Sequence, residues 1–184
     1  MKTGLVLVDI QNDYFPGGNM ELVAMQPAAA TAATVLGEFR DRKAPVYHIQ
    51  HLSVRPGATF FIPDTEGAET HTSVAPAGGE PVIQKNFPNS FRDTALLETL
   101  RDDNTESLVI CGAMSHMCID ATTRAAFDLG FSCIVVSDAC ATRDLQFEGR
   151  TIPARDVHAA FMAALSVPYA SVVTARELAV GAES

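Results

Sequence analysis

Short runs of apolar, mostly β-branched residues alternate along this chain with longer stretches of helical periodicity. The runs at 4–9 and 107–112 are apolar almost without a break, which is typical of strands that are buried on both faces of a sheet. Strands that alternate with helices build a parallel sheet covered by helices. The pattern therefore predicts an α/β protein with a central, mainly parallel sheet.

Six strands are expected, and the helical stretches lie between or after them. The strands are predicted at residues 4–9, 45–50, 81–85, 107–112, 132–136 and 170–173, and the helices at about 26–43, 93–102, 117–129, 155–165 and 175–180. The last helix opens with a capping-box pattern in Thr174 and Glu177.

Two long segments, 52–80 and 141–153, show no clear periodicity. Loops of that length in a compact domain are usually lids or interface elements. The first segment contains Phe60 and Phe61. Two roles stay open for these aromatic side chains: they cover a small substrate, or they anchor the loop to the body of the protein.

Length and charge exclude several classes of protein. The 184 residues fit one domain, 1–184, around a single core, and no apolar run approaches the roughly 20 residues of a membrane span. The 13 basic and 22 acidic side chains give a net charge of −9, which disfavours nucleic acid and anionic lipid as partners. Strand-like residues begin at Gly4, so no export signal is expected and the protein is predicted to be cytoplasmic, with reduced thiols.

Three reactive side chains stand at or just beyond the ends of predicted strands. Asp9 ends the first, Lys85 ends the third, and Cys118 follows the fourth after a short turn that contains Gly112. The carboxyl ends of parallel strands line one crevice, so an acid, an amine and a thiol are expected to meet there. This arrangement favours a cysteine hydrolase.

Cys118 is the preferred nucleophile among four cysteines. It lies where the helical stretch begins, and backbone N–H groups and a nearby ammonium are expected to stabilise its thiolate there. Cys140, which follows the fifth strand, is the rival candidate, whereas Cys111 and Cys133 lie inside apolar runs and are interpreted as core residues. The helical face of Cys118 is predicted to continue through Thr122, Ala125 and Leu129.

The other polar residues have simpler interpretations. Asp9 is equally consistent with a cap of the following loop, and most lysines are solvated surface charges, which weakens the case for Lys85. The histidines do not have the spacing of a metal site, so no metal or cofactor is predicted, and they are interpreted as satisfied or solvent-exposed side chains: His48, His51, His71 and His116.

Segments 8–15, 85–91 and 111–122, together with Ser137-Asp138-Ala139, resemble the isochorismatase-like cysteine hydrolases, which include nicotinamidase and N-carbamoylsarcosine amidohydrolase. The resemblance implies a three-layer α/β/α, Rossmann-like fold with a six-stranded sheet. It also implies a catalytic triad and a cis peptide between Ala113 and Met114, whose N–H would form an oxyanion hole with that of Cys118. The implied triad is Asp9, Lys85 and Cys118, and the implied substrate-binding residues are Phe15, Phe91 and Met117.

Departures from the family pattern narrow the expected chemistry. Nicotinamidases carry a metal-binding Asp-x-His after the second strand, where this chain has His51-Leu52-Ser53, so a metal-dependent nicotinamidase is disfavoured. Isochorismatases proper act on a vinyl ether without a cysteine nucleophile. The presence of Cys118 therefore favours hydrolysis of a carbon–nitrogen bond in a small amide, carbamoyl or lactam-type substrate. The resemblance further implies a homo-oligomer, with 117–129 and 141–165 as candidate surfaces.

Two hypotheses from other classes remain at this point. The first is a thiol redox or sensor protein, in which Cys118 forms a reversible disulfide with Cys140. The second is a binding or scaffold protein built on a hydrolase fold, because a fold alone does not determine a function.

Overall fold

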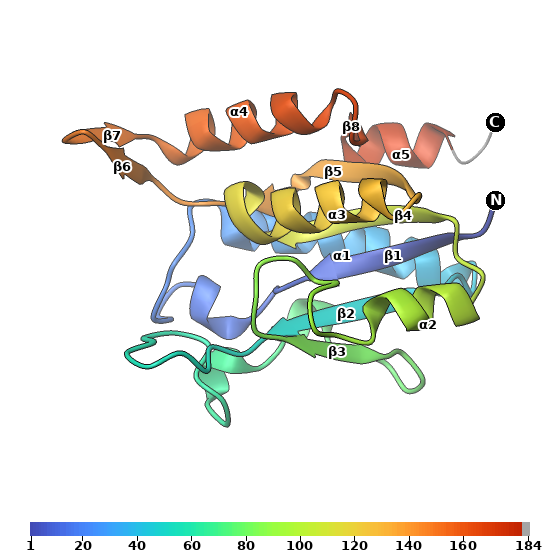
Figure 1. Cartoon of the computed structure of the whole chain (residues 1–184), viewed down its shortest axis with the longest axis horizontal. Coiled ribbons are helices and arrows are strands. Elements are labelled where there is room, and N and C mark those ends of the chain that lie inside the picture. The colour runs from blue at the N-terminus through green and yellow to red at the C-terminus, as the bar shows by residue number, and fades with distance from the viewer. Residues whose placement is uncertain (182–184) are drawn as a thin grey trace.

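Six parallel strands form one sheet in the computed structural model, which describes residues 1–181 (Figure 1). Their order across the sheet is β3-β2-β1-β4-β5-β8, and all five neighbouring pairs are parallel. The predicted strands are confirmed within one residue at most ends, except that β5 continues to residue 141. The strands are β1 (Thr3–Val8), β2 (Val46–His51), β3 (Val82–Lys85), β4 (Ser107–Ala113), β5 (Ser132–Ala141) and β8 (Ser171–Val173).

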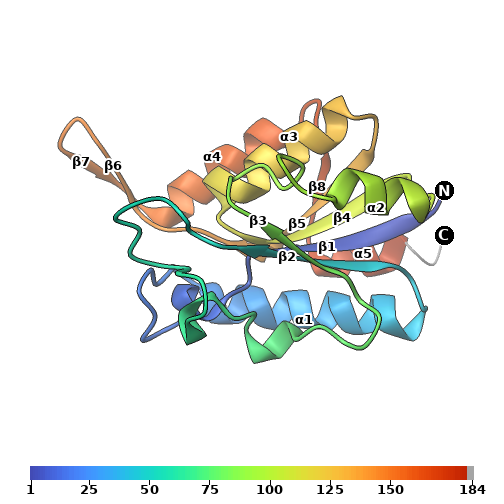
Figure 2. The ribbon, with the colours of Figure 1, turned by 60° about the horizontal axis from the view of Figure 1, so that its bottom comes forward.

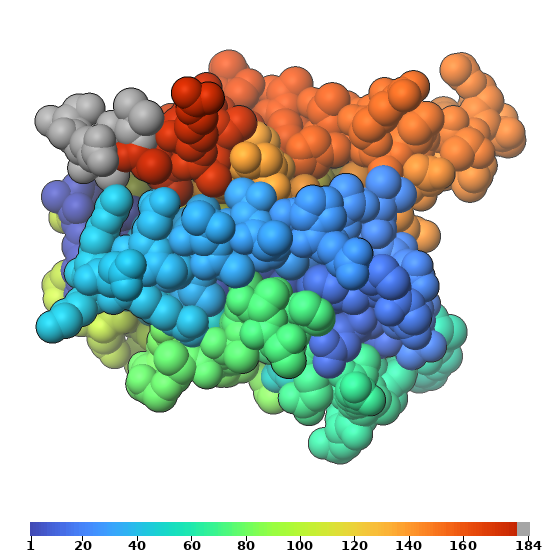
Figure 3. Space-filling model, turned by 180° about the vertical axis from the view of Figure 1, so that it is seen from behind, coloured from blue at the N-terminus to red at the C-terminus, as the bar shows by residue number. Residues whose placement is uncertain are grey.

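Helices cover both faces of this sheet, which confirms the predicted three-layer α/β/α architecture (Figure 2). One face carries α1 (Met25–Asp41) and α5 (Ala175–Gly181). Seen from behind, α1 runs as a light-blue band across the middle of the molecule (Figure 3). The other face carries α2 (Leu96–Asp102), α3 (Asp120–Asp128) and α4 (Ala154–Leu165).

Burial explains why the strands could be recognised. Every residue of β4 is buried, and in β1 only Thr3 is not, so these strands are apolar on both faces. Helix α1 buries one stripe at helical spacing, formed by Met25, Ala28, Ala29, Ala32, Val35, Leu36 and Phe39. The capping box is also confirmed: Thr174 N–H and Oγ1 donate to the Glu177 carboxylate, and Glu177 N–H donates back to Thr174 Oγ1.

The two segments without periodicity contain short elements. The first holds the 3-10 turns η2 (Glu66–Ala68) and η3 (Thr72–Val74), and the second holds a hairpin of β6 (Leu145–Phe147) and β7 (Arg150–Ile152) that projects from the body (Figure 1). Elements of three residues are too short to show a period in the sequence. No helix among residues 1–181 has both the length and the apolar character needed to cross a bilayer.

Candidate active site

Asp9, Lys85 and Cys118 meet at the carboxyl edge of the sheet. Asp9 follows the last residue of β1, Lys85 is the last residue of β3, and Cys118 lies in the turn η4 (Ser115–Ile119) beyond β4. Since β3, β2, β1 and β4 are neighbours in that order, their ends converge as the sequence predicted. All three side chains are buried.

The backbone changes direction sharply where these strands end. Asp9 has a left-handed φ of 53°, which aspartate tolerates better than most residues. Gly112 has a φ of +129°, and a Cβ at this position would collide with the Val8 carbonyl of the adjacent strand, so only glycine fits there. The Ala113–Met114 peptide bond is cis.

Cys118 lies in a π-helical turn, not in the first turn of an α-helix. Within η4, Ile119 N–H donates to Met114 O at 3.2 Å, a wider span than the α-helical bond. Helix α3 begins only at Asp120. Cys118 therefore lies in the turn that joins β4 to α3, and this turn contains one residue more than a continuous α-helix would.

The Lys85 ammonium is the centre of the cluster. Its Nζ donates to Asp9 Oδ2 at 2.7 Å and to Cys118 Sγ at 3.3 Å, and it also lies 3.1 Å from both His51 Nδ1 and the Phe87 carbonyl oxygen. Neither the Asp9 nor the Lys85 side chain is exposed to solvent. The ammonium thus joins the carboxylate and the thiol into one hydrogen-bonded group.

The second carboxylate oxygen of Asp9 is free to accept a proton. Asp9 Oδ1 is buried and has no hydrogen-bond partner among residues 1–181. An Asp9 carboxylate oxygen and the Cys118 Sγ lie within 4.8 Å of each other. A buried acceptor without a partner is costly, and such exceptions are concentrated at functional sites.

Burial and the neighbouring charges act in opposite directions on the pKa of Lys85, and the Asp9 and Lys85 charges do so on the pKa of Cys118. Burial alone would lower the pKa of Lys85, but the neighbouring Asp9 and Cys118 raise it above its ordinary value, so the amine stays protonated. Burial and Asp9 raise the pKa of the Cys118 thiol, and Lys85 only partly offsets them. The expected stabilisation by the Lys85 ammonium is present, but burial and the Asp9 charge outweigh it, so the pKa of the Cys118 thiol lies above its ordinary value.

Asp9, His51 and Cys118 also offer three ligand atoms within 4.8 Å of one another, a spacing that a metal ion could use. However, the Lys85 ammonium already contacts a donor atom of each of these residues. A metal ion at the same point would have to displace a buried ammonium, so this donor set fits lysine better than a metal.

The sequence interpretation missed His51, which is the last residue of β2 and pairs in register with Lys85. Burial lowers its pKa to about 4, and the charges of Lys85 and Arg55 act in the same direction, against Asp9. His51 is therefore neutral near pH 7 and accepts a hydrogen bond from Lys85. The strand-end position that pointed to Asp9 and Lys85 was also the available signal for His51.

A cavity of about 410 Å³ opens onto Cys118. Its walls are mostly apolar or aromatic, with Tyr14, Phe60, Phe87, Met114 and Met117 among the lining residues. Met117 lies in this wall as the family resemblance implied. A cavity of this size with a small number of polar groups is typical of sites for small molecules.

Phe15 and Phe91 do not line this cavity, and their expected positions need correction. Phe15 turns away from it and stacks on the His71 ring, with the ring centroids 3.6 Å apart. Phe91 is half-buried and packs against the core, with its ring centroid 6.1 Å from that of Phe131. The preceding Ser90 is hydrogen-bonded to Thr122 of α3, which holds this segment against that helix. Tyr14, Phe60 and Phe87 are the phenylalanine and tyrosine side chains that line the cavity instead.

The 52–80 segment forms one wall of the cavity and is fixed by buried polar side chains. Asp13 accepts from Phe61 N–H at 2.6 Å, and Gln11 bonds to His51 and to Ala68. Phe61 is fully buried, with its ring centroid 4.5 Å from that of Tyr14, whereas Phe60 lines the cavity. The two open roles are therefore divided: Phe61 anchors the loop and Phe60 faces the cavity.

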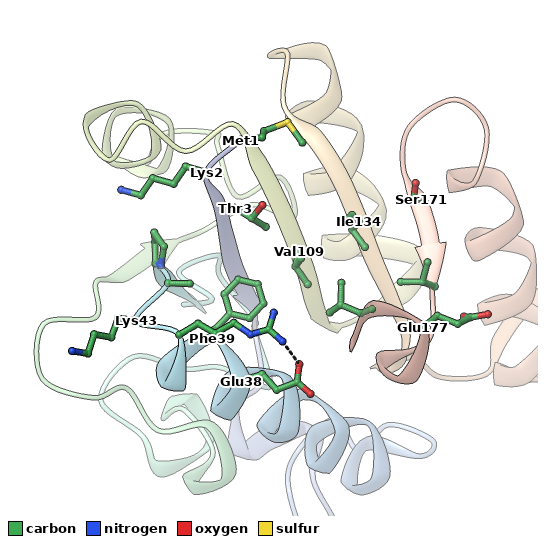
Figure 4. A pocket seen from close by; sticks show the side chains of 15 residues that line it. Met1, Lys2, Thr3, Glu38, Phe39, Lys43, Val109, Ile134, Ser171 and Glu177 are labelled. Atoms are coloured by element: carbon green, nitrogen blue, oxygen red, sulfur yellow. Dashed lines mark ion pairs between the residues drawn. The ribbon is translucent and has the colours of Figure 1, made fainter. Parts of the chain in front are cut away.

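A larger cavity, of about 640 Å³, lies at the opposite edge of the sheet (Figure 4). It is lined by residues such as Thr3, Phe39, Val109 and Ile134, and the Arg42–Glu38 ion pair lies beside it. The cysteines and the buried Asp9–Lys85 pair lie elsewhere. The smaller cavity is therefore the candidate active site, because Cys118 lines it and the Asp9–Lys85 pair lies beside Cys118, although its volume is lower.

The other three cysteines are also buried and free. Cys111 and Cys133 lie in β4 and β5 as core residues, which confirms their interpretation. Cys140 pairs in register with Gly112 and is close enough to Cys111 to raise the pKa of that thiol, after the larger effect of burial. It lines a separate cavity with Ser137 and His158 and takes no part in the Lys85 cluster.

Comparison with known proteins gives one consistent family. The family model described as "Isochorismatase domain" matches residues 3–177. The uncharacterized isochorismatase family protein YddQ of Bacillus subtilis is 52% identical over 95% of this chain and 97% of its own length. A solved isochorismatase-type hydrolase from Oleispira antarctica is 52% identical, with a TM-score of 0.93 over 96% of this chain and 95% of that one. Maleamate amidohydrolase of Pseudomonas putida is 26% identical over 96% of this chain and 84% of that enzyme.

Proposed function

The chain belongs to the isochorismatase family of hydrolases, and from this premise we propose that it is a metal-independent cysteine hydrolase. Its substrate is a small amide, carbamoyl or lactam-type compound, and its intermediate is a thioester on Cys118. The observation that carries the proposal is the contact of Lys85 Nζ with both Asp9 Oδ2 and Cys118 Sγ at the end of an apolar cavity.

In the proposed first half-reaction, Asp9 acts as the base and Cys118 as the nucleophile. Asp9 Oδ1 accepts the thiol proton while Lys85 balances the negative charge, and Sγ bonds to the substrate carbonyl carbon. The N–H groups of Met114 and Cys118 stabilise the resulting oxyanion. The carbon–nitrogen bond then breaks, and Asp9 returns its proton to the departing amine.

In the second half-reaction, water replaces the amine. Asp9 accepts a proton from water, the hydroxyl oxygen attacks the thioester carbon, and the carbon–sulfur bond breaks. Asp9 then returns the proton to the Cys118 sulfur. One amide and one water molecule yield one acid and one amine, and the protein returns to its starting state.

The choice of a carbon–nitrogen bond rests on the thiol and on relatives. One relative, maleamate amidohydrolase, carries an amide-hydrolysing activity in its name and aligns with 96% of this chain. Cys118 supplies the nucleophile that such a reaction needs, and an isochorismatase-type cleavage of a vinyl ether would leave this buried thiol without a role. We therefore place amide hydrolysis first and ether cleavage second.

The decisive test is ammonia release from a panel of small primary amides and carbamoyl compounds, with excess chelator present. We expect release by the wild-type protein and by Cys140→Ala, a buried cysteine outside the cluster, and none by Cys118→Ala. Folding of both variants is checked by circular dichroism. An active Cys118→Ala protein, or activity that the chelator removes, would contradict the proposal.

A further inference from the structure

The turn η4, which carries Cys118, is held by a histidine that the sequence analysis did not consider. Its first residue, Ser115, is buried, and Ser115 Oγ lies 2.8 Å from Nδ1 of His158 in α4. The same hydroxyl oxygen lies 3.2 Å from the carbonyl oxygen of Ala141, the last residue of β5. One serine side chain therefore ties this turn to a helix and to a strand.

The two contacts determine which atom donates in each hydrogen bond. A hydroxyl group has one hydrogen to donate, and a carbonyl oxygen can only accept. Ser115 Oγ therefore donates to Ala141 O, and His158 donates its Nδ1–H to Ser115 Oγ. Burial lowers the pKa of His158, so its ring is neutral near pH 7. The hydrogen-bond pattern thus assigns the tautomer with the proton on Nδ1.

A second histidine holds the next residue of the turn. His116 Nδ1 lies 2.6 Å from Oγ1 of the buried Thr142, which follows β5 directly. The His116 ring also packs edge-on against Phe161 of α4, with the ring centroids 6.0 Å apart. Two successive residues of η4 are therefore fixed to the same strand end and to the same helix.

These contacts end next to the atoms that the proposed reaction uses. Ser115 shares a peptide unit with Met114, which supplies one N–H group of the proposed oxyanion hole. The carbonyl oxygen of that unit accepts from Met117 N–H at 3.0 Å and from Ile119 N–H at 3.2 Å, and these residues are the two neighbours of Cys118. A displacement of Ser115 would therefore move both the thiol and the oxyanion donor.

Ser115 and His158 do not form a second reactive pair. A serine beside a histidine can act as a nucleophile with its base. However, Ser115 is fully buried, so a substrate does not reach its hydroxyl group. His158 lines the separate cavity beside Cys140 and not the cavity at Cys118. The pair can therefore affect the reaction only through the position of the turn.

We propose, on the basis of the proposed function, that His158 is a positioning residue for the reaction at Cys118. Its Nδ1–H fixes Ser115, and Ser115 fixes the turn in the arrangement that brings the thiol and the Met114 N–H to the same carbonyl group. His158 itself does not touch the substrate. Its loss therefore lowers kcat and leaves KM nearly unchanged, because small displacements of reacting groups slow the chemical step.

The test compares two substitutions of His158 by ammonia release from the small amide that the wild type hydrolyses best. His158→Leu removes the donor, whereas the amide of His158→Asn can place an N–H group near the position of Nδ1. We expect His158→Leu to lower kcat about tenfold to a hundredfold with little change in KM, and His158→Asn to recover most of this loss. Wild-type kcat in His158→Leu, a loss through KM alone, or no recovery by asparagine would overturn the inference.

The matched control weakens the same helix without touching the contact. Ala160→Gly lies at an exposed position inside α4, where glycine lowers helix stability. It should lower the melting temperature and leave kcat unchanged. A loss of kcat in Ala160→Gly equal to that in His158→Leu would show that the effect comes from general destabilisation of α4, against the inference.

Ser115→Ala removes the same contact from its other side. If His158 and Ser115 act through one hydrogen bond, the variant that combines Ser115→Ala with His158→Leu has a kcat no lower than that of the slower single variant. Losses that multiply would show that the two residues act separately, and would overturn the inference.

Two further measurements do not depend on turnover, so they separate this inference from the proposed function. NMR of the histidine ring nitrogens should show His158 protonated on Nδ1 near pH 7. Hydrogen exchange of residues 114–119 should be faster in His158→Leu and Ser115→Ala than in the wild type or in Ala160→Gly. If both results are obtained but no amide is hydrolysed, the proposed function fails and the contact stands. A ring protonated only on Nε2, or unchanged exchange, rejects the contact itself.

Discussion

Lys85 Nζ lies 2.7 Å from Asp9 Oδ2, and neither side chain is exposed to solvent. A buried pair of this kind is most costly when only one partner is removed, because the other charge stays in the interior alone. We expect Asp9→Asn and Lys85→Met each to lower the free energy of unfolding by about 3–5 kcal/mol. The double variant should lose clearly less than the sum of the two. Urea denaturation of the four proteins measures this coupling, and strictly additive losses would show that the pair is not coupled.

The raised pKa of Cys118 predicts slow alkylation near neutral pH. Burial and then the Asp9 charge raise this pKa, whereas Lys85 lowers it, so the thiolate is scarce at pH 7 and its amount increases as the pH rises. Mass spectrometry of iodoacetamide-treated protein measures the rate at Cys118 against pH. A plateau that begins below pH 7 would show that the thiolate is present in the resting protein.

Asp9→Asn should change the alkylation rate of Cys118 and the rate of amide hydrolysis in opposite directions. Removal of the Asp9 charge takes away one cause of the raised Cys118 pKa and leaves Lys85 to stabilise the thiolate, so alkylation at pH 8 is expected to become faster. Amide hydrolysis should fall at least about a hundredfold, because the general base is lost. Asparagine keeps the left-handed conformation that residue 9 requires. If the alkylation rate and the rate of amide hydrolysis both rise or both fall, the result argues against the proposed role of Asp9.

Substitutions of two glycines test whether the contact between Asp13 and Phe61 holds the cavity wall in place. A Cβ on Gly67 would collide with the Asp13 carboxylate, which holds Phe61 N–H and thus the loop that carries Phe60. Gly67→Ala is expected to raise KM several-fold and to lower stability by about 1–3 kcal/mol. Gly78→Ala is the matched control, since no atom lies within 4 Å of the position that its added methyl group would occupy. Steady-state kinetics and thermal unfolding compare the two, and identical behaviour would show that this contact does not hold the loop.

The β6–β7 hairpin gives a prediction about assembly. It pairs with no other described strand and exposes Phe147 and Ile152, and an isolated two-stranded hairpin is only marginally stable in water. We expect a second copy of the chain to cover it. Light scattering should give an oligomeric mass for the wild type and for Val82→Ser, an exposed residue at the sheet edge, and a smaller mass for Phe147→Ser. A monomeric wild type would contradict this expectation.

The fold and the centre of the site were readable from the sequence because both depend on strand ends. A strand buried on both faces, such as β1, appears as an apolar run, so the end that carries Asp9 could be located directly. The edge strand β3 is buried only at Ile83 and Lys85, and the short run before Lys85 was sufficient to locate its end.

The phase of α3 could not be read, because the sequence carries no signal for the one extra residue that the π turn inserts before the helix. Cys118 and Thr122 of the predicted face are buried, but Ala125 is only half-buried and Leu129 is 39% exposed. Ile119, Thr123 and Ala126 are buried in addition.

Side-chain directions in the loops were the other part that the sequence did not reveal. Tyr14 and Phe15 are adjacent in one aromatic pair, yet only Tyr14 faces the cavity, because loop conformation and not periodicity sets their directions. His51 was considered only as a possible metal ligand, because the sequence analysis examined how far apart the histidines are along the chain. Its contact with Lys85 arises from pairing between β2 and β3, and the distance along the chain does not predict that pairing. Contacts between separate strands had to come from the structure.

The candidate site depends on four adjacent strands together. Its three polar side chains, Asp9, Lys85 and Cys118, come from the ends of β1 and β3 and from the turn after β4, and β2 lies between β3 and β1. Asp9 and Lys85 are 76 residues apart in sequence, and no contiguous fragment that ends before Cys118 contains the nucleophile. Parallel pairings with such long separations form slowly and late in folding. Recovery of thiol-dependent activity after dilution from denaturant therefore reports completion of the whole central sheet, which spectroscopic signals from single helices do not.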